Sequence, residues 1–562
     1  MAEAVDGLTT GIRVAGVRRV GAGRRALAVF ALGVSLLALG YAAVAPAGLL
    51  KNNDLALREA AAAASGATDS LPRLCSACGP AAPPWIAHGS SISTDAAGNQ
   101  LVDPRQVAAS AAEAPPDRRF GVVQAYAAPY AASYAGVGWE RVNFDWPSLQ
   151  PNAHGAWNRA GVSGAMIGRE IAAGREVVGI IGGRPRWAVD ARGLPRGLYL
   201  PADDPANVWG AFVAELARRY RGRVRHWIVW NEPDVWDPHI SGYTWPGSVD
   251  DFAQLQKVAY TQIKRVDPTL VVHLAATTYW WDAAYGRPLY FGRLLDALAR
   301  DPAARAHHWY FDVASAHIYN VPDDVERILR IDRALMHAHG FGKPIWLVET
   351  NATPTIDGPW AMRVPPWTTT AREQAAFVAQ VTSLALAAGA ERVSFYKMAD
   401  PPSMSRLAYP AGLVRPDGTV RPVLAAFRAT THALAGWVGA TDLGITGSVR
   451  AVAVDRGARG GTLALWNTGP TPINVTVTVA APAQGIDGVP NAEPVVVADD
   501  DTRQPAPVTR AAGQSILHLI LEPGRCARDP RCNSHLGGAP LMVVASALPR
   551  LLAATPAAPA GG

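Results

Sequence analysis

The chain has 562 residues and a formal net charge of +6. Hydrophobic residues make up 49% of it and charged residues 17%, a composition that excludes disorder over most of the chain. The length exceeds that of one ordinary domain and fits a barrel of about 250 residues or more with a smaller second domain. The basic residues are scattered and accompany no aromatic-basic motif, so we expect no nucleic-acid partner.

An uncharged apolar run, residues 26–50, follows a cluster of arginines and precedes Lys51. It is long enough to span a bilayer, and the arginines predict a cytoplasmic N-terminus. Residues 1–51 are therefore predicted to form a membrane anchor, which places the rest of the chain on the extracytoplasmic side. The alternative is a secreted protein whose signal peptide is cleaved near residues 45–47; the long n-region favours the anchor.

Residues 52–118 are rich in Ala, Pro and Ser without sustained alternation, which predicts a juxtamembrane stalk. The four cysteines form two close pairs, Cys75 with Cys78 and Cys526 with Cys532. In an exported protein such pairs predict disulfides, arranged either as two local loops or as bridges between the two segments. The second spacing does not fit a zinc ribbon and no histidine pair accompanies it, so we expect no metal site.

Short apolar runs alternate with amphipathic stretches over residues 119–435. The predicted strands are residues 120–126, 139–146, 177–182, 224–230, 271–275, 311–319, 344–349 and 392–396. Helices are predicted between them, for example over residues 209–220 and 252–263, and Thr370 with Glu373 forms a capping-box pattern that opens another. This alternation predicts an α/β fold, the parallel (β/α)8 or TIM barrel. An open doubly wound sheet is the alternative, but no Gly-rich phosphate loop follows the first strand.

A different rhythm begins after residue 435, where short strands are separated by Gly, Pro and Asp. The predicted strands are residues 449–454, 462–466, 473–479, 494–497 and 515–521. They predict an all-β, sandwich-like domain over residues 436–525, which either covers one side of the barrel or binds carbohydrate. Residues 526–562 are assigned to a C-terminal tail, whose apolar run at 541–548 is too short to span a bilayer.

Two carboxylates follow predicted strands of the barrel. Asn231 and Glu232 come directly after the fourth strand and before Pro233, and Glu349 ends the seventh. Because the C-terminal ends of barrel strands meet at one mouth, both side chains should face the same cavity. Retaining glycoside hydrolysis requires two carboxyl groups placed in this way, one as acid/base and one as nucleophile. We predict that Glu232 is the acid/base and Glu349 the nucleophile, with no metal or cofactor.

The segment WIVWNEPDVW, residues 227–236, resembles the clan A glycoside hydrolases, most closely family 39, with family 5 as a close rival. A helix ending in IKRVDP, residues 263–268, follows it, and the resemblance covers residues 120 to about 427. It implies a retaining (β/α)8 enzyme with the acid/base after the fourth strand and the nucleophile after the seventh. It also implies that Asn231 holds the 2-hydroxyl of the sugar.

Two further strands carry the same resemblance. In WERVNFDW, residues 139–146, Arg141 matches a second-strand arginine that bonds the nucleophile in these enzymes. In ASAHIYN, residues 314–320, His317 and Tyr319 match a sixth-strand His-x-Tyr pattern and should touch substrate or nucleophile. For His317 the alternative is a core histidine satisfied by the backbone.

The eighth strand departs from the clan's pattern. Clan members commonly place an aromatic platform, often Trp, at its end, whereas this chain has VSFYKMAD with Tyr396 or Lys397 nearest that position. If Lys397 faces the cavity, we expect an acidic or otherwise unusual sugar. Among the 18 tryptophans, Trp187, Trp236 and Trp280 fall in predicted loops and are predicted to contact sugar, with packing as the alternative.

Together these features predict a membrane-anchored, extracytoplasmic glycosidase. It would cleave O-glycosidic bonds of a β-linked oligo- or polysaccharide through a glycosyl-enzyme intermediate. Two alternatives stay open: an inactive barrel that binds envelope glycans, and a transglycosylase that uses the same intermediate.

Overall fold

The structure, a computed structural model, describes residues 93–94, 100–101, 117–153, 155–239, 242–405, 408–480, 494–498, 503–505, 508–511, 513–527, 531–532 and 535–557. The predicted anchor at residues 26–50, most of the predicted stalk, and Cys75 and Cys78 lie outside the described residues. Within the described ranges, no helix combines the length and the apolar character that crossing a bilayer requires.

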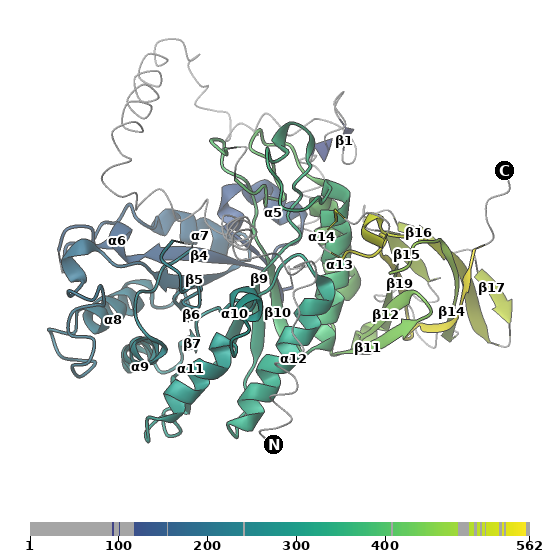
Figure 1. Cartoon of the computed structure of the whole chain (residues 1–562). Coiled ribbons are helices and arrows are strands. Elements are labelled where there is room, and N and C mark those ends of the chain that lie inside the picture. Colours follow the sequence, from purple (N-terminus) through teal and green to yellow (C-terminus); the bar gives the residue numbers. More distant parts are fainter. Residues whose placement is uncertain are drawn as a thin grey trace, which may run out of the picture.

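Eight parallel strands form the barrel in the order β7-β6-β5-β4-β3-β10-β9-β8 (Figure 1). They are β3 (Phe120–Val123), β4 (Trp139–Asp145), β5 (Glu176–Gly182), β6 (His226–Val229), β7 (Val271–His273), β8 (Ala314–His317), β9 (Ile345–Thr350) and β10 (Ala390–Phe395). Two parallel bridges, from His273 to Val313 and from Thr277 to Ala316, join the segments of β7 and β8 and complete the ring. All eight predicted strands of the barrel are confirmed.

Helices surround the strands. They are α5 (Pro129–Tyr134), α6 (Trp146–Leu149), α7 (Gly164–Ala172), α8 (Val208–Tyr220), α9 (Val249–Val266), α10 (Trp280–Tyr285), α11 (Tyr290–Ala299), α12 (Pro322–Ala338), α13 (Ala371–Ala387) and α14 (Pro422–Leu434). The predicted capping box opens α13, where the Thr370 side chain accepts from the Glu373 amide and the Glu373 carboxylate accepts from the Thr370 amide. Gly389, with φ of 84°, lets the chain turn after this helix.

Alternation along the strands separates two apolar regions. On β4, Val142 and Phe144 point outward into the large core between strands and helices. Trp139 points inward, where it packs with Ile228, Trp346 and other residues that fill the barrel. Arg141 lies two residues after Trp139 and therefore also points inward, nearer the mouth, which is the end of the barrel at the C-termini of its strands.

The second domain contains two antiparallel sheets, ordered β11-β12-β13-β19-β15-β16 and β17-β18-β14-β20. Their strands are β11 (Gly439–Thr446), β12 (Val449–Asp455), β13 (Gly461–Asn467), β14 (Ile473–Ala480), β15 (Val495–Ala498), β16 (Arg503–Pro505), β17 (Val508–Ala511), β18 (Gln514–Leu521), β19 (Leu541–Ala545) and β20 (Arg550–Pro556). A separate apolar cluster from both sheets forms the core of this sandwich. The five predicted strands are present.

The predicted boundary at residue 525 is wrong, because residues 526–562 are not a separate tail. Strand β19 pairs with both β13 and β15, and β20 pairs with β14. The apolar run at 541–548 is too short to cross a bilayer, but it suits a central strand with neighbours on both edges. The sandwich therefore needs the last described residues of the chain to complete both sheets.

The sandwich packs beside α13 and α14 of the barrel (Figure 1). The Gln380 amide of α13 donates to the Gly538 carbonyl at 2.9 Å, and the Thr462 hydroxyl donates to the Ala433 carbonyl. Arg450 on β12 forms an ion pair with Glu326 on α12. These contacts place the sandwich against the side of the barrel rather than over its mouth.

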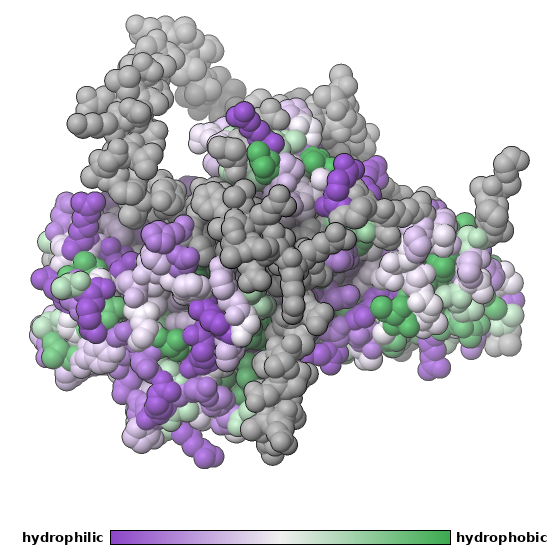
Figure 2. Space-filling model, in the orientation of Figure 1, coloured by the Kyte–Doolittle hydropathy of each residue, from purple (hydrophilic) through white to green (hydrophobic). Residues whose placement is uncertain are grey.

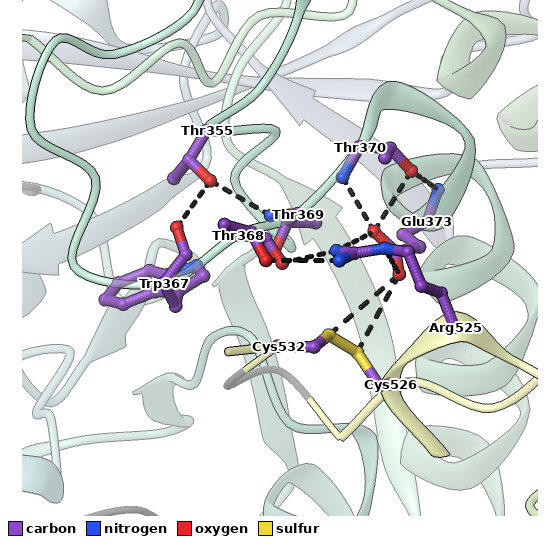
Figure 3. The surroundings of a disulfide bond; sticks show 9 residues. All are labelled: Thr355, Trp367, Thr368, Thr369, Thr370, Glu373, Arg525, Cys526 and Cys532. Atoms are coloured by element: carbon purple, nitrogen blue, oxygen red, sulfur yellow. Dashed lines mark hydrogen bonds and ion pairs between the residues drawn. A yellow bond between two sulfur atoms is a disulfide. The ribbon is translucent and has the colours of Figure 1, made fainter. Parts of the chain in front are cut away.

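Cys526 and Cys532 form a disulfide, so this pair makes a local loop and no bridge to the N-terminal segment. Figure 3 shows the loop against the start of α13. Arg525 donates to both carboxylate oxygens of Glu373 at 3.0 and 2.9 Å, and both sulfur atoms also face this carboxylate. One glutamate thereby joins the helix cap to the sandwich.

Several exposed apolar side chains lie on sandwich strands. Leu443 and Ile445 on β11, Ile520 on β18 and Leu552 on β20 are all exposed. Figure 2 shows hydrophobic residues interspersed with hydrophilic ones on the visible face of this domain. Single apolar residues of this kind are normal on a protein surface and define no site.

Candidate active site

A cavity of about 160 Å³ lies at the mouth of the barrel. Its lining residues are Val123, Gln124, Arg141, Asn143, Asp145, Ile180, Gly182, Gly183, Asn231, Glu232, Thr244, Glu349 and Tyr396. They lie on β3, β4, β5 and β9 or in the segments that follow β3, β5, β6 and β10. Both predicted carboxylates thus face one cavity at the barrel mouth.

The backbone turns sharply where β6 delivers Glu232 to the cavity. Trp230 and Glu232 have φ values of 74° and 46°, in the left-handed region that residues other than glycine seldom adopt. The Trp230 amide bonds the Ile181 carbonyl at 2.7 Å, and the Glu232 amide bonds the Ala276 carbonyl at 3.0 Å. Neighbouring strands therefore fix the strained segment, and such strain is typical of functional sites.

Glu232 and Glu349 converge although they lie far apart in the sequence. One carboxylate oxygen of each and one ring nitrogen of His317 all lie within 4.8 Å of one another. Retaining glycosidases hold their two carboxyl groups about 5 to 5.5 Å apart, whereas inverting enzymes leave a wider gap for a water molecule. The separation in this barrel is that of a retaining pair.

Glu349 is buried, yet it is held in its ionised form. Arg141 forms an ion pair with one carboxylate oxygen, and the Tyr319 hydroxyl donates to the other. Burial alone would raise the pKa of Glu349, but the charge of Arg141 and the hydrogen bond from Tyr319 outweigh it and lower that pKa below its usual value. An ionised carboxylate is the form that can act as a nucleophile.

The pKa of Glu232 is shifted in the opposite direction, upward. Burial, followed by the negative charge of Glu349 and that of Asp234, raises its pKa well above the ordinary value for glutamate. These opposite shifts favour the protonated form of Glu232 and the ionised form of Glu349. Two carboxyl groups whose pKa values are driven apart in this way are the pattern of an acid paired with a nucleophile.

His317 lies between the two carboxylates and has side-chain partners. Its Nδ1 is 2.7 Å from Glu232 Oε1, and its Nε2 is 3.2 Å from Arg141 Nη1. Burial lowers the pKa of His317 to about 3, so the ring is neutral. Because an arginine can only donate, Nε2 accepts and Nδ1 carries the hydrogen that it donates to Glu232. The alternative of a histidine satisfied by the backbone is therefore wrong.

The spacing of Glu232, His317 and Glu349 would also suit a metal ion. Their donor atoms are already engaged, however. Arg141 and Tyr319 take the two oxygens of Glu349, and His317 contacts Glu232 through one nitrogen and Arg141 through the other. The positive guanidinium stands where a cation would have to approach, so these residues fit proton transfer better than metal binding.

Asn231 and the three predicted tryptophans occupy different places. Asn231 lines the cavity beside Glu232. Trp280 is half-buried, and its ring lies 6.1 Å from that of Tyr319, whose hydroxyl donates to Glu349. Trp236 is 41% exposed at the rim, where the Arg287 guanidinium lies 4.6 Å from its ring centroid.

Trp187 packs against other residues of the barrel, as the alternative to sugar contact predicted. Its ring lies 5.9 Å from that of Trp146, and its Nε1 donates to the Gln150 carbonyl at 2.7 Å. It is not among the residues that line the cavity. Contact of Trp187, Trp236 or Trp280 with a sugar stays a prediction.

The end of β10 shows which of two candidates faces the cavity. Tyr396 lines it and packs against Tyr319 with ring centroids 6.4 Å apart. Lys397 instead lines a second, neighbouring cavity. The sequence predicted an acidic sugar only if Lys397 faced the cavity that holds the two carboxylates. Lys397 does not line that cavity, so this condition is not met.

Some lining residues were missed in the sequence. Asn143 and Asp145 lie two and four residues after Arg141 on β4, so the same alternation that points Arg141 inward would have indicated them. Gln124, with φ of 58°, and Thr244, whose hydroxyl donates to the Asn231 carbonyl at 3.0 Å, lie in loops without such a pattern.

No protein-family model matches the chain. A β-xylosidase from Caldicellulosiruptor saccharolyticus is 40% identical over 76 residues, a match that covers 12% of this chain and 14% of that enzyme. The structure of a family 39 glycoside hydrolase from Bacteroides cellulosilyticus WH2 aligns with a TM-score of 0.53 and 18% identity, covering 77% of this chain and 81% of that one. The barrel fold that the resemblance to clan A glycoside hydrolases implied is thereby confirmed, and a family 39 enzyme is among the structures that share it.

Proposed function

We propose that the protein hydrolyses β-linked glycosides with retention, using Glu349 as the nucleophile and Glu232 as the acid/base. The observation that carries the proposal is a protonated and an ionised carboxyl group within 4.8 Å of each other across one cavity. The names of the two similar proteins, a β-xylosidase and a family 39 glycoside hydrolase, agree with this chemistry.

In the first step, Glu349 attacks the anomeric carbon of the bound sugar. The bond from that carbon to the leaving oxygen breaks, and Glu232 donates its proton to this oxygen. His317 donates to Oε1 of Glu232, so the acidic proton resides on the other oxygen, Oε2. The products of this step are the free leaving-group alcohol and a sugar ester of Glu349.

In the second step, Glu232, now ionised, takes a proton from a water molecule. That water attacks the anomeric carbon, and the ester bond to Glu349 breaks. Arg141 and Tyr319 stabilise the returning carboxylate, because both already contact its oxygens. Asn231 is placed to bond the 2-hydroxyl of the sugar throughout, a contact that strengthens as charge develops at the ring.

The two alternatives fare differently. A barrel that only binds glycans needs no proton donor opposite an ionised carboxylate, so the split pKa values disfavour it. A transglycosylase would use the same intermediate and differ only in whether a sugar or a water accepts it. Product analysis with a second sugar in excess separates these two.

We also propose that the barrel is displayed outside the cytoplasm on the anchor at residues 26–50. The Cys526–Cys532 disulfide supports this location, because such bonds persist in oxidising compartments. Protease added to intact cells that make the chain should remove the barrel. A barrel that is protected until the membrane is broken would contradict the location, and a barrel free in the medium would favour signal cleavage.

The activity is tested with a panel of aryl β-glycosides and the full chain in detergent. We expect at least one sugar to be released by the parent, and Glu349→Ala to lower kcat by about 10⁴-fold or more. Glu391→Ala, at an exposed residue on β10, is the matched control and should keep full activity. Turnover that survives in Glu349→Ala would refute the nucleophile, and no turnover of any glycoside by the parent would refute the activity.

A further inference from the structure

A second cavity, of about 480 Å³, lies beside the first at the barrel mouth. Gln124, at the end of β3, lines both cavities. At the end of β10 the two are divided between consecutive residues, because Tyr396 lines the first and Lys397 the second. The second cavity is therefore a direct neighbour of the proposed catalytic carboxylates.

Lys397 is the unusual residue of this cavity. Its side chain is buried, with 3% of the residue exposed, and its ammonium makes no hydrogen bond or ion pair with any residue that the structure describes. Its one contact with an aromatic face is the Tyr396 ring, 5.8 Å from Nζ. Burial lowers the pKa of Lys397 to about 8, so the ammonium is still largely charged at neutral pH.

The charged groups around this ammonium already pair among themselves. The Asp357 carboxylate accepts hydrogen bonds from the guanidinium groups of Arg415, at 2.9 and 3.0 Å, and Arg421, at 2.7 Å. The Asp400 carboxylate accepts from the Arg421 guanidinium at 2.7 Å and from the backbone amides of Ala411 and Gly412. Asp417, the other carboxylate of the lining, accepts from the Thr419 amide and hydroxyl at 3.0 and 2.7 Å. Among the charged residues of this lining, Lys397 is therefore the one without a hydrogen-bond or ion-pair partner in the part of the chain that the structure describes.

We propose that the second cavity binds a carboxylate-bearing sugar, a uronic acid, whose carboxylate pairs with Lys397. A buried ammonium without a partner is costly, and an anionic ligand would supply the missing partner through a charge-assisted hydrogen bond. A carboxylate of the substrate is the simplest such ligand, since the cavity adjoins the one in which the sugar is cleaved.

The side of the cleaved bond follows from the proposed function, on which this assignment rests. Glu232 protonates the leaving group and stands at the end of β6, whereas the second cavity lies at the ends of β3 and β10. In the sheet order these strands are separated from β6 by β5 and β4. The acidic sugar is therefore expected on the glycone side, away from the leaving group.

The test compares two methyl β-disaccharides, one with a terminal glucuronate and its counterpart with that carboxyl reduced to an alcohol. Binding is measured by calorimetry with the full chain in detergent, in a Glu232→Gln background that keeps the ligands intact. We expect the acidic ligand to bind about tenfold or more tightly than the neutral one, in line with a charged hydrogen bond. Adding Lys397→Met should bring the ratio of the two affinities close to one, and Lys397→Arg should preserve it.

Lys343→Met is the matched control. Lys343 is half-buried, lies just before β9 at the opposite end of the barrel and donates to the carbonyls of His308 and Phe311 at 2.8 and 2.6 Å. Its loss should leave the ratio of affinities unchanged. Equal affinity of both ligands in the Glu232→Gln background, or a preference that survives Lys397→Met, would overturn the assignment.

The outcomes also separate this assignment from the proposed function. Hydrolysis of neutral aryl glycosides by the parent, without any preference for the acidic ligand, would refute only the uronate site. A preference for the acidic ligand that depends on Lys397, in a parent that cleaves nothing, would refute only the hydrolase. If Lys397→Met does not fold, the comparison of the two ligands in the Glu232→Gln background still decides.

Discussion

The two ends of the barrel hold similar residues and differ in what those residues can do. At the mouth, Arg141, Glu232, His317 and Glu349 form what we call the mouth cluster. At the other end, Glu176, His226, His273 and Arg392 form the floor cluster. Each contains an arginine, a histidine and a carboxylate in hydrogen-bond contact.

The floor cluster is a closed structural network. His226 Nδ1 lies 2.9 Å from His273 Nε2, and Arg392 holds Glu176 at 2.7 Å. The Trp346 ring packs against the His226 ring with centroids 4.7 Å apart. Its one carboxylate is matched by its one arginine, so every charge is compensated.

The mouth cluster has one carboxylate more than it has arginines, and a cavity reaches it. The second carboxylate cannot ionise beside the first, so Glu232 retains a proton that it can give away. The comparison teaches that residue types alone do not define a catalytic site in a barrel. A catalytic site also requires a carboxyl group whose charge is not compensated and a cavity through which a substrate can reach it.

After the loss of the nucleophile itself, the largest effect should come from Glu232→Ala. Without the acid, kcat/KM for glycosides with poor leaving groups should fall by about 10² to 10⁴-fold, because the leaving oxygen no longer receives a proton. Glycosides with acidic phenols as leaving groups should lose much less in the first step. Initial rates on a leaving-group series measure this, and Glu176→Gln in the floor cluster serves as the control. A loss independent of the leaving group would contradict the assignment.

Arg141→Met should lower activity by a smaller factor and change its pH dependence. In the parent, Arg141 helps to hold the pKa of Glu349 low, so the nucleophile stays ionised well into the acid range. Its removal should raise that pKa and move the acidic limb of the kcat/KM profile to higher pH by about 1 to 3 units. Arg392→Met, in the floor cluster, should leave the limb in place. An unmoved limb in Arg141→Met would show that the charge of Arg141 is not what keeps Glu349 ionised.

The floor cluster should affect stability instead. Burial lowers the pKa of His226 to about 4, and that of His273 lies well below its usual value. The unfolded chain therefore binds more protons between about pH 6.5 and 4, so the free energy of unfolding should fall as the pH drops through that range. The loss attributable to His226 is about 3 kcal/mol.

Urea unfolding at pH 7 and pH 4.5 measures this dependence. His226→Gln should flatten it, whereas His307→Gln, at an exposed histidine, should not. A parent whose unfolding midpoint is the same at both pH values would contradict the account of the floor cluster.

The smallest effects are expected at the tryptophans. Trp236→Ala at the rim should raise KM about threefold for an oligosaccharide and leave an aryl monosaccharide unaffected, because an exposed ring can stack only on a sugar beyond the first. Trp187→Ala should lower the melting temperature without changing KM, since Trp187 packs on Trp146. Steady-state kinetics with both substrates and thermal melts separate the two roles.

Much of the barrel could be predicted because each strand is a short apolar run bounded by amphipathic helices. The sandwich was harder. Strand β11 was missed because its residues are largely exposed and show no apolar run, and β19 and β20 because their partners lie many residues away along the chain. Local sequence patterns do not contain such pairings.

The two carboxylates could be predicted because each follows an apolar strand. Their protonation states could not, since these depend on the distances from Arg141, Tyr319 and each other across separate strands. The sequence also could not predict which cavity the Lys397 side chain lines. It follows the end of β10 together with Tyr396, and only the folded barrel determines which of the two residues faces which cavity.

The central claim is that Glu349 forms a covalent bond to the sugar while Glu232 supplies the proton. A 2-deoxy-2-fluoro glycoside of a sugar that the parent cleaves tests it most directly, because the fluorine slows release of the intermediate. The account predicts stoichiometric inactivation and an adduct that peptide mass spectrometry locates on Glu349. An adduct on any other residue would contradict it.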